Sequence, residues 1–217
     1  MSKLSELIQQ YCPDGVEYRP LWQLTSWDKR FKEVENSKQI RIDKYNYYFA
    51  AELNSIISEN GDIKILTTSK TDLYTTEELA GDNVVDAEII CIPGGGNPIV
   101  QYYDGKFVTS DNRIARVLDA NKLNTRYLYY AMINKIKTIA SFYRGSGIKH
   151  PAMANVLNIE IPVPPMPVQE EIVKILDKFS KLTTDISEGL PAEIKMRHQQ
   201  YEYYRDKLLS FNRLEKN

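Results

Sequence analysis

Residues 162–186 read PVPPMPVQEEIVKILDKFSKLTTDI, and this stretch decides the fold. Four of its first six residues are proline, which marks a boundary because proline removes a backbone donor and disfavours helix just before it. Beyond the prolines the apolar residues step by four and three positions, which is the spacing of a coiled-coil seam. The seam consists of Val168, Ile172, Ile175, Phe179, Leu182 and Ile186.

The same spacing resumes after an interruption at Gly189-Leu190-Pro191. It continues through Leu190, Ile194, Arg197, Tyr201, Tyr204, Leu208 and Phe211. Because Pro191 clashes with a preceding helical turn, we predict two helical arms with a kink or a break between them. An arm of about 20 residues spans roughly 30 Å.

One helix cannot bury such a seam by itself, so the seam requires a partner. The partner is the other arm, the short N-terminal helix, a second copy of the chain or a different subunit. The predicted interface residues are Ile172, Ile175, Phe179, Leu182, Ile186, Leu190, Ile194, Tyr201, Tyr204, Leu208 and Phe211.

The region before the prolines mixes short strands and helices. Apolar periodicity predicts helices over 3–11 and 125–141, the second capped by Asn124 or Thr125. Strands are predicted over 63–68, 87–92, 113–118 and 156–163, with a β-hairpin over 99–109 that turns at Asp104-Gly105. The fold class is therefore α+β: a mixed α/β domain over 1–163, then a helical and coiled-coil region over 164–217.

Composition excludes several classes of protein. The formal net charge of −1 over 217 residues excludes DNA binding by bulk positive charge, so any such binding needs a local patch or a partner subunit. No apolar run is long enough to span a membrane, and the N-terminus lacks a signal-peptide core. Cys12 and Cys91 form no CxxC pair, which suits a reducing cytoplasm, and only two histidines are present. We therefore predict no metal site and a cytoplasmic protein.

No motif for catalysis or for a cofactor is present. Gly94-Gly95-Gly96-Asn97 follows a strand, but it lacks the Gly-Lys-Ser/Thr ending of a phosphate-binding loop and is better explained as a turn between two strands. Residues 142–147 superficially resemble the glycine loop that holds S-adenosylmethionine in methyltransferases. They follow a helix rather than a strand, and no Asn/Asp-Pro-Pro-Tyr/Phe motif accompanies them. The prediction is a chain with no catalytic residue and no cofactor.

The loop over 143–150 offers cations, a hydroxyl, a histidine and an aromatic ring on a glycine-containing backbone. Such a set suits contacts to DNA phosphates and to base edges, although a solvated loop with incidental charges would look the same. Thr67-Thr68-Ser69-Lys70 is a weaker case, and a glycine turn can bring backbone close to DNA. The candidate DNA-binding residues are Thr68, Lys70, Asn97, Tyr143, Arg144, Ser146, Lys149 and His150.

Six stretches together resemble a known family, the DNA specificity (S) subunits of type I restriction-modification systems. They are residues 4–18, 145–150, 158–165, 168–177, 189–194 and 200–209. The resemblance frames the chain from both ends, whereas residues 25–140 resemble the family only in kind. Family members usually hold two recognition domains and two spacer helices, and this chain holds one of each, so it resembles a half-subunit.

The resemblance implies a non-catalytic protein that binds double-stranded DNA and reads a bipartite sequence. It implies a target recognition domain over 1–163, and spacer helices over 164–217 for dimerisation and for binding the methyltransferase (modification) subunit. The restriction subunit would join through that complex. A half-subunit would act as a homodimer, and its two-fold symmetry would demand a palindromic bipartite site.

Two other functions remain open from the sequence. The chain could be a coiled-coil adaptor that touches no DNA, or the recognition half of a fused restriction-methylation enzyme. Sequence-dependent DNA affinity separates the first of these from a specificity subunit.

Overall fold

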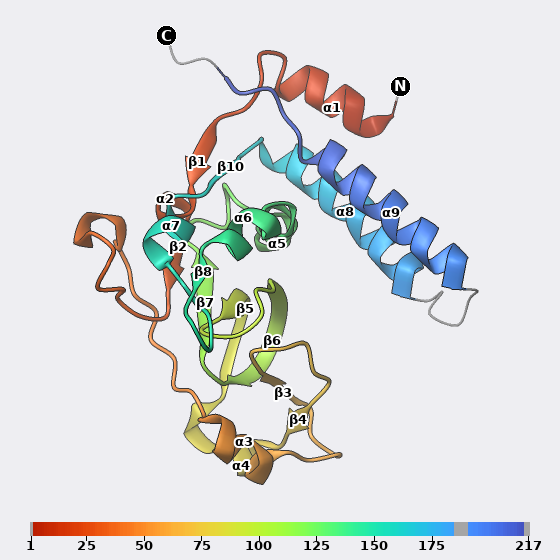
Figure 1. Cartoon of the computed structure of the whole chain (residues 1–217). Helices are drawn as coiled ribbons and strands as arrows, with labels where there is room; N and C mark the ends of the chain where they lie inside the picture. The colour runs from red at the N-terminus through yellow and green to blue at the C-terminus, as the bar shows by residue number, and fades with distance from the viewer. Residues whose placement is uncertain (1, 185–190, 215–217) are drawn as a thin grey trace. The chain divides into compact units, whose positions relative to one another are not determined.

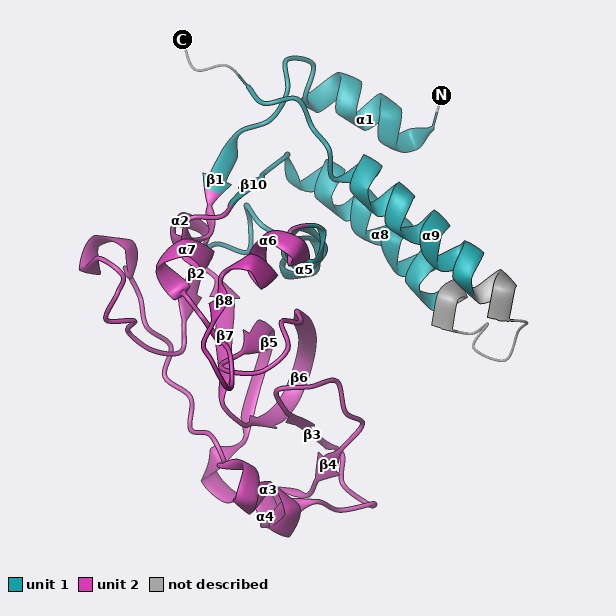
Figure 2. Cartoon of the chain, in the orientation of Figure 1, with its two compact units in different colours: residues 1–19, 119–134, 160–217 teal, residues 20–118, 135–159 magenta. Residues whose placement is uncertain are grey.

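The computed structural model of the chain describes residues 2–184 and 191–214, with the side chains of 182–194 left out (Figure 1). The predicted interface positions Ile186 and Leu190, and the side chains of Leu182 and Ile194, therefore lie outside the described residues. Contacts divide the chain into two units: unit 1 comprises residues 1–19, 119–134 and 160–217, and unit 2 comprises 20–118 and 135–159 (Figure 2). This division differs from a single boundary after residue 163, because the N-terminal helix and the helix from Thr125 group with the C-terminal helices.

Unit 1 is mostly helical. Its elements are α1 (Lys3–Tyr11), β1 (Tyr18–Pro20, of which Pro20 is assigned to unit 2), α5 (Thr125–Asn134), β10 (Glu160–Pro162), α8 (Met166–Thr184) and α9 (Pro191–Leu208). Helix α1 matches its predicted range, and Asn124 caps α5 as predicted, because its Oδ1 accepts the Tyr127 N–H over 2.9 Å. The two predicted C-terminal arms are present as α8 and α9, which pack against each other. Their pairing as a coiled coil with another chain stays a prediction.

Gln169 organises the start of α8. Its side chain is fully buried, and its Oε1 accepts the backbone N–H of Asn124 over 2.9 Å. Its Nε2 donates to the carbonyl oxygens of Lys122 (2.9 Å) and Pro164 (2.7 Å). One side-chain amide thus satisfies three backbone groups where the proline segment enters the helix.

Charged and aromatic side chains fix α8 against its neighbours in unit 1. Arg126 of α5 pairs with Asp177 of α8 at 2.8 Å, and the Tyr130 hydroxyl donates to the same carboxylate. Further along, the ring of Phe179 stacks on that of Tyr204 of α9 with centroids 5.5 Å apart. The C-terminal half of α8 is therefore held by α5 and α9 of its own chain.

The predicted seam is thus partly closed within unit 1. Ile172 is fully buried there, so its side chain offers no surface to another molecule. Ile175, Phe179, Tyr201, Leu208 and Phe211 are half-buried, whereas Tyr204 is 37% exposed. Met196 and Tyr203 of α9 are 69% and 60% exposed, and neither was among the predicted interface residues.

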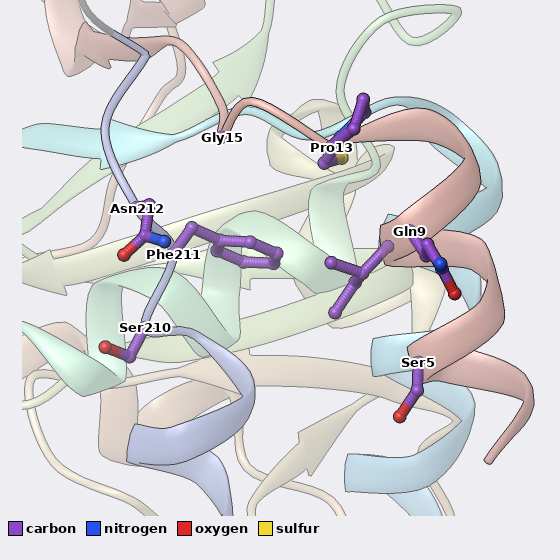
Figure 3. A pocket seen from close by; sticks show the side chains of 9 residues that line it. Ser5, Gln9, Pro13, Gly15, Ser210, Phe211 and Asn212 are labelled. Carbon is purple, nitrogen blue, oxygen red and sulfur yellow. The ribbon is translucent and has the colours of Figure 1, made fainter. Parts of the chain in front are cut away.

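The segment after α9 returns to the N-terminal part of the chain. Val16 donates its N–H to the Asn212 carbonyl and accepts the Leu214 N–H, each over 3.0 Å. A hollow of about 480 Å³ lies between this segment and α1, and the ring of Phe211 extends toward α1 across it (Figure 3). The two ends of unit 1 are therefore joined by backbone hydrogen bonds.

Unit 2 is built on a six-stranded sheet with the order β2-β7-β5-β6-β3-β4. The strands are β2 (Thr25–Trp27), β3 (Ile63–Leu66), β4 (Tyr74–Thr75), β5 (Val85–Pro93), β6 (Gln101–Thr109) and β7 (Asn112–Val117), with a small pair formed by β8 (Tyr143–Arg144) and β9 (His150–Pro151). The α-helices are α2 (Leu21–Leu24), α3 (Ala50–Ile56), α4 (Glu77–Ala80), α6 (Ile136–Ser141) and α7 (Met153–Leu157), and the 3₁₀ helices are η1 (Asn36–Lys38) and η2 (Gly81–Asn83). Only β3 and β6 pair in parallel among the described strand pairs of this sheet.

Strand β6 curves so strongly that its two ends approach each other. Gln101 begins the strand, and its Nε2 donates to the Thr67 carbonyl over 2.9 Å. Thr67 directly follows Leu66, which pairs with Thr109 at the other end of β6. Eight residues of straight strand would span roughly 26 Å, so the two ends can share a neighbour only because the strand bends. Gly105 in its middle has φ +127°, a conformation that other residues rarely adopt.

The predicted hairpin at Asp104-Gly105 is wrong. Both residues lie inside β6, where they pair with Glu88 and Ala87 of β5. The hairpin is formed instead by β5 and β6, and the glycine stretch from Gly94 is its turn, as the sequence favoured. Asp-Gly supplies a bend within a strand here because pairing with β5 continues across it.

Two other predicted elements are also wrong in part. The helix predicted over 125–141 breaks at Lys135 into α5 and α6. The strand predicted over 156–163 is shorter in the structure and consists of β10 alone, because its first residues belong to α7. That helix buries Met153, Val156 and Leu157, and their spacing of three and four places them on one helical face.

No described helix combines the length and the apolar composition that crossing a bilayer requires.

Candidate nucleic-acid interface

Two loops of unit 2 that are far apart in sequence lie against each other. One is the turn between β5 and β6, which we call the glycine loop (residues 94–98), and the other joins β8 to β9 and is called the 144–150 loop. The Gly96 N–H donates to the Lys149 carbonyl over 2.9 Å, and Nδ1 of His150 lies 2.6 Å from the Gly94 carbonyl oxygen. These bonds hold six of the eight predicted DNA-binding residues in one place, namely Asn97, Tyr143, Arg144, Ser146, Lys149 and His150.

Tyr143 anchors the two loops to the end of β5. It is buried, and its hydroxyl donates to the Pro93 carbonyl at the end of β5 over 2.8 Å. Its pKa is raised well above the usual range, mainly by burial, so the phenol remains neutral. The structure thus gives Tyr143 a supporting place, while Asn97 and the predicted members of the 144–150 loop are exposed.

Two glycines of the glycine loop leave little room for a side chain. A Cβ at Gly94 would lie 2.6 Å from the Asp111 carbonyl oxygen and 2.6 Å from the Arg113 guanidinium. A Cβ at Gly95 would lie 3.0 Å from the His150 ring and 3.0 Å from the Ile148 side chain. Beside this contact the two loops and α6 line a hollow of about 350 Å³.

A third loop, which starts at Thr67, reaches the same end of β5. The Thr67 carbonyl accepts hydrogen bonds from Gln101, which pairs with Cys91, and from Asn112, which pairs with Pro93. This loop carries the other two predicted residues, Thr68, which is half-buried, and Lys70, which is exposed. The end of β5 therefore meets the glycine loop and the start of the loop that carries Thr68 and Lys70.

A charged cluster supports the glycine loop, and sequence reasoning missed it. The Gly94 N–H donates to the Asp111 carbonyl over 2.8 Å, and the Asp111 carboxylate pairs with Arg113 at 2.6 Å and with Lys29 at 3.7 Å. The neighbouring Asp28 accepts the Ile114 N–H over 3.0 Å. Burial raises the pKa of Asp28 to about 6, although that N–H and the two cations lower it. No local signal marks this cluster, because its charged members come from two segments that are far apart in sequence, Asp28-Lys29 and Asp111 to Arg113.

We expect Asp28→Asn to change how stability depends on pH. The folded-state pKa of about 6 exceeds the ordinary value of 3.8, so folded Asp28 binds a proton that unfolded Asp28 releases. The stability that this proton uptake gives the folded state is therefore full below pH 3.8 and is lost as the pH rises through about 6. Asparagine keeps the acceptor for Ile114, so the variant should be more stable than wild type at neutral pH by about 1–3 kcal/mol, with the gap closing in acid.

Urea unfolding across this pH range measures the effect, with Asp82→Asn as a control that removes an exposed carboxylate of unit 2. A stability gap between wild type and Asp28→Asn that stays constant from acid to neutral pH would contradict the raised pKa.

An exposed aromatic pair was also not predicted as part of a site. Tyr47 and Phe49 are 47% and 64% exposed, and their rings meet edge to face with centroids 5.5 Å apart. Lys29 lies 5.7 Å above the Tyr47 ring and also pairs with Asp111 of the charged cluster. The sequence offers only three nearby tyrosines, Tyr45, Tyr47 and Tyr48, a pattern that fits ordinary half-buried tyrosines equally well.

Within residues 2–184 and 191–214, no group of three or more His, Cys, Asp or Glu side chains could hold a metal ion. Cys12 and Cys91 are both buried, and burial raises the pKa of the Cys91 thiol to about 12. The chemistry that the three loops offer is hydrogen bonding and positive charge, which suits binding rather than catalysis.

Comparison with known proteins identifies the family. The family model for the type I restriction modification DNA specificity domain matches residues 49–196, which is more than half of the chain. The chain therefore belongs to the family of type I restriction-modification DNA specificity domains. This assignment confirms the resemblance and the prediction of a non-catalytic specificity component.

Individual relatives agree with the family model. The chain is 37% identical over 105 residues to the EcoR124I/EcoR124II specificity subunit of Escherichia coli, which covers 48% of this chain and 26% of that protein. It is 32% identical over 114 residues to the MpnII specificity subunit of Mycoplasma pneumoniae, covering 52% and 34%. The chain thus matches only about a quarter to a third of the length of these two relatives.

A solved S subunit from M. genitalium shares the fold. The TM-score is 0.58 with 18% identity, covering 80% of this chain and 41% of that one. At this identity the likeness concerns the fold alone, and it confirms the mixed α/β class.

Proposed function

We propose that this chain is the DNA-reading component of a type I restriction-modification complex, and that it reads one sequence element with the three loops at the end of β5. The observation that carries this proposal is the convergence of the glycine loop, the 144–150 loop and the loop from Thr67. Family membership supports it independently. The loops present hydrogen-bonding groups on a fixed backbone, which is what reading base edges requires.

The charge of the chain suits a DNA-recognition protein that binds DNA only weakly by itself. The loops expose Lys70, Arg144 and Lys149, while the whole chain has a formal net charge of −1. Affinity for DNA grows with the number of phosphates that cations neutralise, so three exposed cations provide a limited share. The modification subunit is proposed to supply the remaining phosphate contacts.

The helices of unit 1 are proposed to bind protein partners. Exposed apolar and aromatic side chains on α9, namely Met196, Tyr203 and Tyr204, suit a protein interface because tyrosine buries a large ring and keeps a polar tip. We propose that these helices bind the modification subunit, which in turn recruits the restriction subunit. We further propose that they pair two copies through the coiled-coil seam. One specificity-domain match lies in the chain, so a symmetric pair would read a palindromic bipartite site.

Replacing both Arg144 and Lys149 by alanine tests the assignment of the loops. We expect the affinity of the complex with the modification subunit for target DNA to fall about tenfold at moderate salt. The slope of log affinity against log salt should become shallower by about two, since each lost phosphate contact contributes roughly 0.9. Fluorescence anisotropy titrations at several salt concentrations measure both quantities.

The matched control removes two exposed lysines of unit 2 outside these loops, Lys32 and Lys106. This variant should bind like wild type. Unchanged affinity and an unchanged salt slope for the Arg144 and Lys149 double variant would remove the 144–150 loop from the interface. Absence of any sequence-dependent affinity in the wild-type complex would favour an adaptor that touches no DNA.

A further inference from the structure

His150 is held at the surface of unit 2 with one ring nitrogen fixed and the other accessible. Its Nδ1 lies 2.6 Å from the Gly94 carbonyl oxygen. A carbonyl oxygen can only accept, so Nδ1 carries the hydrogen, and Nε2 carries the lone pair when the ring is neutral. Because the residue is exposed, Nε2 on the other side of the ring is the nitrogen that a ligand meets.

The ring is held in this orientation by the glycine loop. A Cβ built at Gly95 would lie 3.0 Å from Cε1 and 3.1 Å from Nδ1 of His150, so the imidazole rests against bare backbone. The backbone of the histidine is fixed as well, since His150 pairs with Arg144 across β8 and β9. The adjacent Lys149 carbonyl accepts the Gly96 N–H. The accessible acceptor is therefore oriented before any ligand arrives, which lowers the entropy lost on binding.

We infer that His150 determines specificity by accepting a hydrogen bond from the exocyclic amino group of one base, either N4 of cytosine or N6 of adenine. In the major groove these amino groups are donors, whereas N7 and O6 of guanine, O4 of thymine and the phosphate oxygens are acceptors. A lone pair at Nε2 bonds to the donors and is repelled by the acceptors. The inference rests on the proposed function and assigns a chemical group to one position of the DNA element.

The neighbouring side chains have the opposite chemistry. Arg144 and Lys149 carry only donors and positive charge, so they suit phosphates and guanine. Ser146 carries a hydroxyl, which suits either kind of partner. Among the side chains of the described 144–150 loop, His150 is thus the one that offers an acceptor without a hydrogen on the same atom.

The test uses the full chain in complex with its modification subunit and a duplex enriched by that complex from a randomised pool. Each adenine in the enriched element is replaced in turn by purine, and each cytosine by 2-pyrimidinone, which removes one amino group at a time. Wild type should lose about three- to tenfold in affinity at a position read by a single hydrogen bond. With His150→Phe, the loss should disappear at one such position and remain at every other position.

The other outcomes overturn the inference in distinguishable ways. If His150→Phe keeps the wild-type profile at all positions, His150 reads no amino group. If the profile flattens at all positions together, His150 only supports the loops through its bond to Gly94. If the wild-type complex enriches no sequence, the proposed function itself fails, and this inference fails with it.

Discussion

Gly94→Ala is expected to abolish sequence-selective DNA binding, with at least a hundredfold loss of affinity for the selected duplex. The added methyl group would lie 2.6 Å from the Asp111 carbonyl oxygen and 2.6 Å from the guanidinium of Arg113. Backbone cannot move aside as a flexible side chain can, so the glycine loop must shift. The shift breaks the Gly94 N–H bond to the Asp111 carbonyl and displaces the whole glycine loop, so the groups that the two loops present to DNA lose their fixed positions.

Gly147→Ala is the matched control for this variant. It adds the same methyl group within the 144–150 loop, where no atom lies within 4 Å of the new Cβ. It should keep sequence-selective binding, because it leaves the contact between the two loops intact. Because overpacking costs about 1–3 kcal/mol, urea unfolding should show Gly94→Ala still folded while selective binding is lost. Selective binding by Gly94→Ala at wild-type strength would show that the arrangement of the two loops is irrelevant to recognition.

Gln169→Met is expected to produce a large loss of stability, lowering the free energy of unfolding by about 3 kcal/mol or more. Methionine keeps the volume of the side chain but makes no hydrogen bond with Asn124, Lys122 or Pro164. Each backbone group left unpaired in a buried site costs roughly 1–3 kcal/mol. The Gln169 side chain is fully buried, so water cannot replace the lost bonds without a rearrangement of the start of α8.

Equilibrium unfolding in urea measures this loss. Glu170→Ala, at the next and exposed position of the same helix, serves as the control and should change stability by less than about 0.5 kcal/mol. If Gln169→Met is as stable as the control, the buried amide does not hold the proline segment to α8.

The sequence predicted elements whose signal is local and repeated. Helix α1 matches its predicted range, and the arms α8 and α9 follow from apolar spacing, since burying one face of a helix imposes that spacing. The strands β3, β5 and β7 appear close to their predicted ranges, since β-branched and other apolar residues fit a pleated, buried surface.

The failures share a physical cause, which is competition from distant parts of the chain. Asp104-Gly105 has the composition of a hairpin turn, but pairing with β5 continues across it and makes it a bend in β6. The residues 153–157 form a helix because burial of Met153, Val156 and Leu157 outweighs the strand propensity of valine. Such outcomes depend on partners that a local pattern does not contain.

The candidate site likewise has one part that the sequence predicts and another part that it does not. The chemistry of the 144–150 loop could be predicted from its residue types. Its contact with the glycine loop could not, because His150 and Gly94 are 56 residues apart. The charged cluster of Asp28, Asp111 and Arg113 was missed for the same reason. These side chains look like ordinary surface charges until the strands bring them together.

The most direct test of the central claim, that this chain reads a DNA sequence through the loops at the end of β5, is selection from a randomised duplex pool. The full chain with its modification subunit is the selecting agent, and the modification subunit alone is the control. We predict that the complex enriches one sequence element, that the element is palindromic and bipartite if two copies pair, and that Gly94→Ala enriches none. Enrichment of no element beyond that of the modification subunit alone would contradict the account.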